Sequence, residues 1–196
     1  NQYTAKEIKP AGWLKRQLQI QAEGLSGHLD KVWPDVRDSG WLGGERNDWE
    51  RGPYWLDGFI PMAYLLEDEE KIARAKRYID AILAGQKEDG WICPCKDEDR
   101  EVYDTWTIYL VTKVLVLYYD CSGDERIPVA VYRILKNYYE LLAAGKIHLH
   151  SWGKARWFEC FIAIRFTYDR YPESWLLDLA KILKEQGTDY NQLTEY

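Results

Sequence analysis

The chain has 196 residues, a length that suits a single domain with one hydrophobic core. Its formal net charge of −6 and the lack of a long Lys/Arg run argue against nucleic acid as a partner. The most apolar stretch, residues 108–119, is interrupted by Thr112 and Lys113 and is shorter than the ~20 residues of a membrane span. We therefore expect a soluble protein.

Cysteine usage and the first residues bear on redox state and processing. Four cysteines are too few for a disulfide scaffold in a chain this long, and the Cys93-x-Cys95 spacing is tighter than a Cys-x-x-Cys zinc knuckle. We expect reduced, structural thiols. The chain begins without a methionine or an apolar signal core, which indicates a trimmed or processed start and leaves the compartment open.

The first element is a helix over residues 12–22, because Trp13, Leu14, Leu18 and Ile20 alternate with polar residues at helical spacing. Residues 24–48 follow, rich in Gly, Asp, Ser and Pro. This connection is far longer than the median of about 4–6 residues, and long loops in compact domains tend to be functional.

The stretch from residue 49 to residue 58 is the main candidate for a functional segment. Three aromatic side chains, two carboxylates and an arginine stand beside a Gly-Pro pair, and an apolar run to Leu66 follows. Pro53 suits the first turn of a helix. Because helix N-termini offer unpaired N–H groups and indoles beside charged groups suit sugars, we interpret it as a carbohydrate-facing loop. The alternative is a loop whose aromatics only cap the core.

Further helices are predicted from the same periodicity. An amphipathic segment follows the first buried helix, and two more pairs of a buried and an amphipathic helix follow. We expect these helices over residues 72–86, 104–119, 127–141 and 157–169, and a last one from Pro172.

Three tryptophans mark a repeat. Trp55, Trp106 and Trp157 are 51 residues apart twice over, each at the front of the buried helix of a pair. This is the period of a repeated helical hairpin. We expect these three rings to pack inside the repeat.

Connection lengths alternate along the chain. The turns near Asp68, Gly123 and Pro172 are short, whereas the loops before each buried helix are long and rich in Trp, Gly, Asp and His. The long loops should therefore gather on one face. The pattern predicts an all-α toroid of the (α/α)6-barrel type. Since six hairpins need twelve helices, about seven helices make an incomplete arc or an open solenoid.

Five segments, in order along nearly the whole chain, resemble the N-terminal part of the catalytic domain of glycoside hydrolase family 127. These are the β-L-arabinofuranosidase-like proteins, formerly domain of unknown function 1680. The segments are Gly24-Leu25-Ser26-Gly27-His28, Glu50-Arg51-Gly52-Pro53-Tyr54-Trp55-Leu56-Asp57-Gly58, Gln86-Lys87-Glu88-Asp89-Gly90-Trp91, Trp106-x-x-Tyr109-x-x-x-Lys113 and Trp175-Leu176-Leu177-Asp178-Leu179-Ala180.

This resemblance implies an (α/α)6 barrel that hydrolyses glycosidic bonds of plant-type glycans in a central cleft. It also implies a cysteine nucleophile, a glutamate and a zinc ion bound by cysteines and a glutamate. Those groups belong to later parts of the family's domain, and Cys93, Cys95 and Cys160 are not assigned to them. We expect residues 1–196 to hold no cofactor, with zinc in the complete enzyme. The remainder of the domain or a second copy would cover the open arc.

Eight residues are predicted to bind the sugar. Trp91 and Trp152 lie in loops and suit stacking. The arginines can hold a hydroxyl or a carboxylate, or can pair with a neighbouring acid. The full set is Glu50, Arg51, Tyr54, Asp89, Trp91, His150, Trp152 and Arg156.

Catalytic residues stay unassigned. Hydrolysis needs two carboxyls about 5–5.5 Å apart for retention or ~6.5–9.5 Å for inversion. The candidates on or beside the long loops are Glu50, Asp57, Asp89, Asp104 and Glu159. Of these, Asp104 fits a helix N-cap better than an acid catalyst, and Asp57 fits a buried hydrogen bond at least as well.

The histidines are less informative. His148 and His150 point to one side of an extended segment, but they lack a third metal ligand. We expect a hydrogen bond to sugar or to a neighbouring loop instead of a metal. His28 is placed to reach the cleft.

Two other functions remain open. One is another toroid enzyme, an unsaturated-uronide hydrolase or a polysaccharide lyase, which would prefer acidic or unsaturated sugars. The other is a non-catalytic helical repeat that binds protein, which would present a flat apolar patch on the long-loop face.

Overall fold

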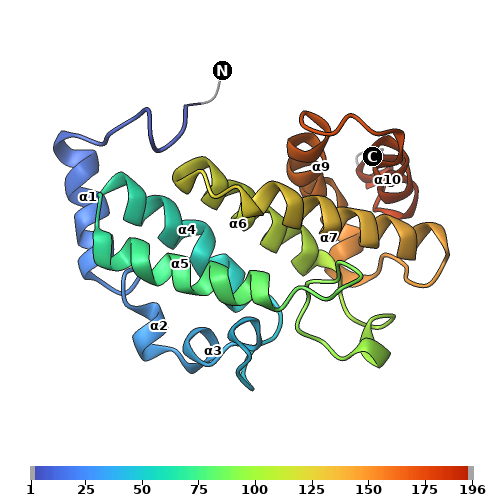
Figure 1. Ribbon diagram of the computed structural model, residues 1–196, viewed down its shortest axis with the longest axis horizontal. Coiled ribbons are helices and arrows are strands. Elements are labelled where there is room, and N and C mark those ends of the chain that lie inside the picture. The colour runs from blue at the N-terminus through green and yellow to red at the C-terminus, as the bar shows by residue number, and fades with distance from the viewer. Residues whose placement is uncertain (1–2, 194–196) are drawn as a thin grey trace.

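The computed structural model describes residues 3–193, and this part of the chain is all-α, with no strand (Figure 1). Seven α-helices have eight residues or more. They are α1 (Gly12–Glu23), α4 (Arg51–Leu65), α5 (Glu69–Ala84), α6 (Trp106–Ser122), α7 (Arg126–Ala143), α9 (Phe161–Tyr168) and α10 (Ser174–Gln186). The all-α prediction is confirmed for the described residues. They contain ten α-helices and not the predicted seven or so, because three short helices lie within the long connections.

Short turns join these helices into three hairpins, α4 with α5, α6 with α7 and α9 with α10. Asp68 begins α5 by accepting a hydrogen bond from the Lys71 N–H. Gly123 ends α6 in the left-handed conformation, with φ of 75°, which favours glycine. The predicted short turns near Asp68 and Gly123 are therefore confirmed with their physical causes.

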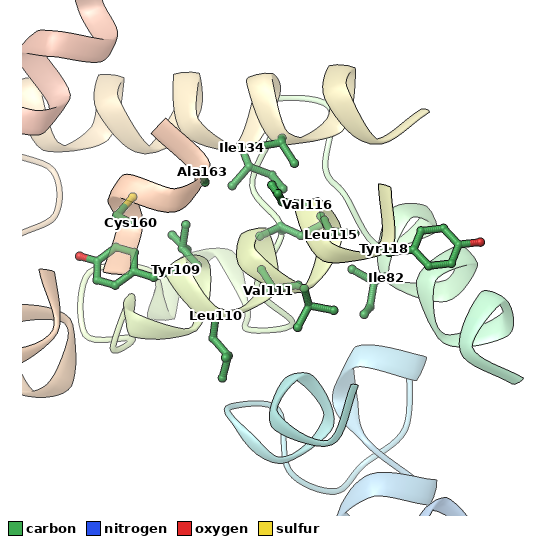
Figure 2. Close-up of a cluster of buried hydrophobic side chains, with 14 of the residues drawn as sticks. Ile82, Tyr109, Leu110, Val111, Leu115, Val116, Tyr118, Ile134, Cys160 and Ala163 are labelled. Atoms are coloured by element: carbon green, nitrogen blue, oxygen red, sulfur yellow. The ribbon is translucent and has the colours of Figure 1, made fainter. Parts of the chain in front are cut away.

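Helix α6 is the centre of the core. Most of its side chains are buried, and it packs against α4, α7 and α9. Figure 2 shows Val111 and Leu115 of α6 among Ile134 of α7, Ala163 of α9 and Ile82 of α5. Because α6 is apolar nearly all round, it is buried on most of its surface, as expected of a core helix.

The connection over residues 24–48 is more ordered than predicted. It contains the short helices α2 (Leu29–Val32), α3 (Pro34–Arg37) and η1 (Gly40–Leu42). The buried Arg74 of α5 donates to Asp30 Oδ1 at 2.8 Å and to the Gly27 carbonyl at 2.8 Å. These bonds hold the connection against α5.

The loops before α6 and α9 also contain short helical turns, namely η2 (Asp97–Asp99), α8 (Ser151–Ala155) and η3 (Trp157–Cys160). The last turn of the described chain is η4 (Tyr190–Leu193). In residues 3–193 no helix is long and apolar enough to cross a membrane.

Candidate functional site

Trp106, the first residue of α6, is the hub of an aromatic cluster. Its buried ring meets Trp49 edge-on at 5.4 Å between centroids, Tyr54 edge-on at 5.4 Å and Trp152 at 5.9 Å with a tilt of 38°. The three neighbours come from the segment before α4, from α4 itself and from α8. The segments that precede successive buried helices therefore meet at this ring.

Arg156 covers the same rings. Its guanidinium carbon lies 5.3 Å from the Trp106 ring centroid and 5.6 Å from that of Trp152. Nη1 donates to Glu159 Oε1 at 2.6 Å, and Trp106 Nε1 donates to Glu159 Oε2 at 3.2 Å. The hydrogen bond to Glu159 holds the guanidinium beside the rings and raises the pKa of Arg156 above its ordinary value. We call Trp49, Tyr54, Trp106, Trp152, Arg156 and Glu159 the Trp106 cluster.

One carboxylate joins the starts of two helices. Asp104 Oδ1 accepts from the Trp106 N–H at 3.1 Å and from the Gly153 N–H at 2.9 Å, and Oδ2 accepts from the Trp152 N–H at 3.0 Å. The N-cap of α6 is Thr105, one residue later than predicted, but the Asp104 side chain still binds the N–H of the first residue of α6, and it also holds α8. A Cβ on Gly153 would lie 3.1 Å from Asp104 Oδ1, so glycine allows this close approach.

A buried chain of hydroxyl groups supports α8 from below. The Thr105 hydroxyl is 3.0 Å from the Tyr138 hydroxyl, which is 2.8 Å from the Tyr109 hydroxyl. Tyr109 in turn donates to the Gly153 carbonyl at 3.4 Å. This network connects α6, α7 and α8 beneath the exposed ring of Trp152.

Two hollows adjoin at Trp152, whose residue is 48% exposed. The first has a volume of about 680 Å³, and its walls include Trp49, Tyr103 and Asp104. The second has a volume of about 490 Å³, and its walls include Arg156, Phe158, Glu159 and Tyr190. Both volumes lie in the range of roughly 300–1,000 Å³ that is usual for ligand sites.

The structure brings three of the predicted binding residues together, namely Tyr54, Trp152 and Arg156. Glu50 and Arg51 lie at the start of α4 and pair with each other, with Arg51 Nη1 3.4 Å from Glu50 Oε1. Arg51 also stacks over the ring of Trp33 at 5.3 Å. For this arginine the alternative of a neighbouring acid is the one observed.

The prediction that Trp91 is an exposed stacking platform is wrong. The residue is 1% exposed, its Nε1 donates to the Cys93 carbonyl at 2.9 Å, and the Arg100 guanidinium lies 4.9 Å from its ring centroid. Arg100 comes from the end of the same loop and covers the ring that the sequence pattern leaves open.

Asp89 belongs to the same group of contacts as Trp91 and Arg100. Its Oδ1 accepts from the Trp91 N–H at 3.0 Å and its Oδ2 pairs with Arg100 Nη1 at 2.5 Å. Burial alone would raise the pKa of Asp89, but Arg100 and the Trp91 N–H hold it below its ordinary value. Asp89 therefore holds its own loop together, some way along the chain from the Trp106 cluster.

The histidines are not gathered around one site. His150 precedes α8, is half-buried, and its Nε2 has no hydrogen-bond partner among the described residues. His28 Nδ1 is 2.9 Å from the Gly24 carbonyl, a local contact, and His28 lines neither hollow. His148 is exposed.

The cysteines do not fit a zinc site. Within residues 3–193 no group of three or more His, Cys, Asp or Glu side chains is placed to hold a metal ion. Burial raises the thiol pKa of Cys93 and Cys160, and it raises that of Cys121 to about 11. These free, buried thiols contribute to packing.

Three further residues of the site were not predicted as ligand contacts, namely Glu159, Tyr103 and Tyr190. The spacing of Arg156 and Glu159 is that of neighbours on one helical turn, and this signal could have found the ion pair. Tyr103 precedes Asp104 and donates to the Asp48 carbonyl at 2.7 Å, which links the segments before α4 and α6. Tyr190 reaches the site from beyond α10, and no local pattern marks it.

No protein-family model and no curated protein matches this chain.

Proposed function

We propose that this chain supplies one wall of a sugar-binding cleft in a glycoside hydrolase of the β-L-arabinofuranosidase-like type. The observation that carries the proposal is the exposed ring of Trp152, set between two hollows and backed by Trp106 and Arg156. An indole ring that is partly desolvated by its neighbours and partly exposed is suited to stack on the apolar face of a sugar.

Polar groups beside the ring support the same proposal. Arg156 keeps N–H groups beyond the one that Glu159 occupies, and its side chain is 39% exposed. Tyr54 is exposed one ring away. Hydrogen-bond donors and acceptors around an aromatic platform fix the orientation of a polyol ligand.

The charges favour an uncharged glycan over a uronic one. Asp48, Asp99 and Asp104 line the first hollow against a single cation, Lys96. In the second hollow Arg156 is neutralised by Glu159 at 2.6 Å. A uronate would meet net negative charge in the first hollow, so the unsaturated-uronide hydrolase and the lyase are the weaker alternatives.

Three of the candidate catalytic carboxylates have structural partners. Asp104 accepts three N–H groups, Glu159 binds Arg156 and Trp106, and Asp57 pairs with Lys113 at 2.7 Å. We assign them to binding and positioning and not to the bond-breaking step. Under the proposal that step, and any zinc ion, belong to the rest of a larger catalytic domain.

Exposed apolar side chains on α9 support the proposal of an incomplete (α/α)6 arc. Phe161 and Ile162 are both exposed, although α9 packs into the core. The remainder of a toroid, or a second copy, would cover them.

The proposal is tested by titrating the folded chain with neutral oligosaccharides from arabinan, xylan and glucan and with oligogalacturonate, followed by calorimetry and by indole N–H signals in NMR. We expect binding of at least one neutral series and perturbation of the Trp106 and Trp152 signals. Binding of oligogalacturonate alone would favour the uronide enzymes. Absence of binding in all four series would refute the proposal.

A matched pair of tryptophan variants controls for the loss of an exposed ring. Trp152→Ala removes the proposed platform, whereas Trp13→Ala removes the exposed ring of α1, outside the Trp106 cluster. The first should abolish most of the binding and the second should leave it unchanged. Equal effects would contradict the assignment of the site.

A further inference from the structure

The two hollows share one wall. Trp152 lines both, with Ser151 and Asp104 on the side of the first and Ala155 and Arg156 on the side of the second. The Trp152 ring packs against Trp106, and the Trp152 main-chain N–H donates to Asp104. A ligand longer than one hollow therefore passes over Trp152.

The chemistry of the two hollows differs. The first offers the exposed side chains of Lys96, Asp48 and Asp99. The second presents the exposed Phe158 with Tyr190 edge-on at 6.1 Å, beside the Arg156–Glu159 pair. One half is thus rich in polar groups for hydroxyls, and the other is largely aromatic.

We propose that the site takes an oligosaccharide and not a single sugar, with one subsite in each hollow and the Trp152 ring between them. This inference rests on the proposed function and adds the ligand's length. Each hollow alone has the volume of a small-molecule site, so the two together take several sugar units. Trp152 contacts the chain where it crosses from one subsite to the other.

The experiment measures affinity against chain length, by calorimetry, for a neutral series from monosaccharide to hexasaccharide. The series is the one among arabino-, xylo- and gluco-oligosaccharides that binds the chain. We expect affinity to rise by about tenfold or more between monosaccharide and tetrasaccharide and then to level off, because each occupied hollow adds contacts.

Two variants separate the subsites. Lys96→Ala changes the first hollow and Phe158→Ala the second, and both side chains are exposed, so the fold should survive, which circular dichroism checks. Each should weaken tetrasaccharide binding several-fold, while only one of them should weaken monosaccharide binding. Trp152→Ala should weaken binding at every length.

The outcomes distinguish this inference from the proposed function. Equal affinity for monosaccharide and tetrasaccharide would overturn the two-subsite arrangement and leave a sugar site in place. The same conclusion would follow if either hollow variant left tetrasaccharide affinity unchanged. Failure of every glycan at every length would instead remove the proposed function itself.

Discussion

Two loops of this protein carry a tryptophan beside glycine and charged residues, and they use it in opposite ways. In the loop before α6, Trp91 is buried under Arg100, and its N–H is bound to the Cys93 carbonyl. In the segment before α9, Trp152 is held at its backbone by Asp104 while its ring stays exposed.

The difference lies in which atoms of the tryptophan the protein occupies. Around Trp91 the partners take the ring face and the indole N–H, so the residue closes its own loop. At Trp152 the partners take the main-chain N–H and part of the ring, and the residue stays 48% exposed, so ring surface is left for a ligand. A loop tryptophan is thus a binding residue only when its anchoring leaves a face open.

The largest effect on stability is expected at Trp91. Trp91→Ala should destabilise the protein by about 3–5 kcal/mol, because it leaves a large cavity under Arg100. Urea unfolding monitored by far-UV circular dichroism measures the change. A loss below about 1 kcal/mol would mean that the ring does not anchor its loop.

Asp104 is the next most sensitive position. Asp104→Ala leaves three N–H groups without their acceptor and should cost about 2 kcal/mol of stability. Hydrogen exchange should accelerate at the amides of Trp152 and Gly153. Asp99→Ala is the control, since this exposed carboxylate holds no helix and its loss should cost under about 0.5 kcal/mol. Unchanged exchange at both amides would argue against the double cap.

Trp152→Ala should show the reverse of Trp91→Ala. We expect a stability change below about 1 kcal/mol, because the ring is already half in water, and a loss of sugar affinity of about tenfold. Thermal unfolding and calorimetric titration of one sample measure both quantities. Large destabilisation with unchanged affinity would make Trp152 a packing residue like Trp91.

The smallest effect is expected from the pH dependence of Asp89. Since Arg100 lowers its pKa in the folded protein, the ion pair stabilises the fold above the unfolded pKa of about 3.9 and loses this effect as pH falls through the lower folded value. Asp89→Asn should therefore cost under about 1 kcal/mol at pH 7, because the pair is partly exposed, and almost nothing near pH 2. Urea unfolding at both pH values checks this, and an equal cost at both would contradict it.

Sequence patterns predicted the helices well because helical periodicity is local. The apolar spacing in α6 and α7 and the turn at Gly123 were sufficient to place one hairpin. The loops were harder to predict. Burial of Trp91 depends on Arg100, and the second hollow depends on Tyr190, and neither partner is marked by a repeat or a spacing.

The candidate site was predicted in part for the same reason. Tyr54, Trp152 and Arg156 were chosen for residue type in long loops, and they do lie around one ring. That ring, Trp106, was expected only to pack inside the repeat. Its second role, as the base on which exposed groups rest, follows from contacts between distant segments, which a single sequence does not show.

The double attachment of Asp104 has a consequence for how the wall responds to an incoming ligand. Because a single carboxylate binds the first turns of both α6 and α8, we expect these two pieces of backbone to move together. A ligand that binds to Trp152 then contacts a preorganised surface, so little conformational entropy of the protein is lost on binding. The anchoring of the helix starts thus keeps the exposed surface at Trp152 rigid as well.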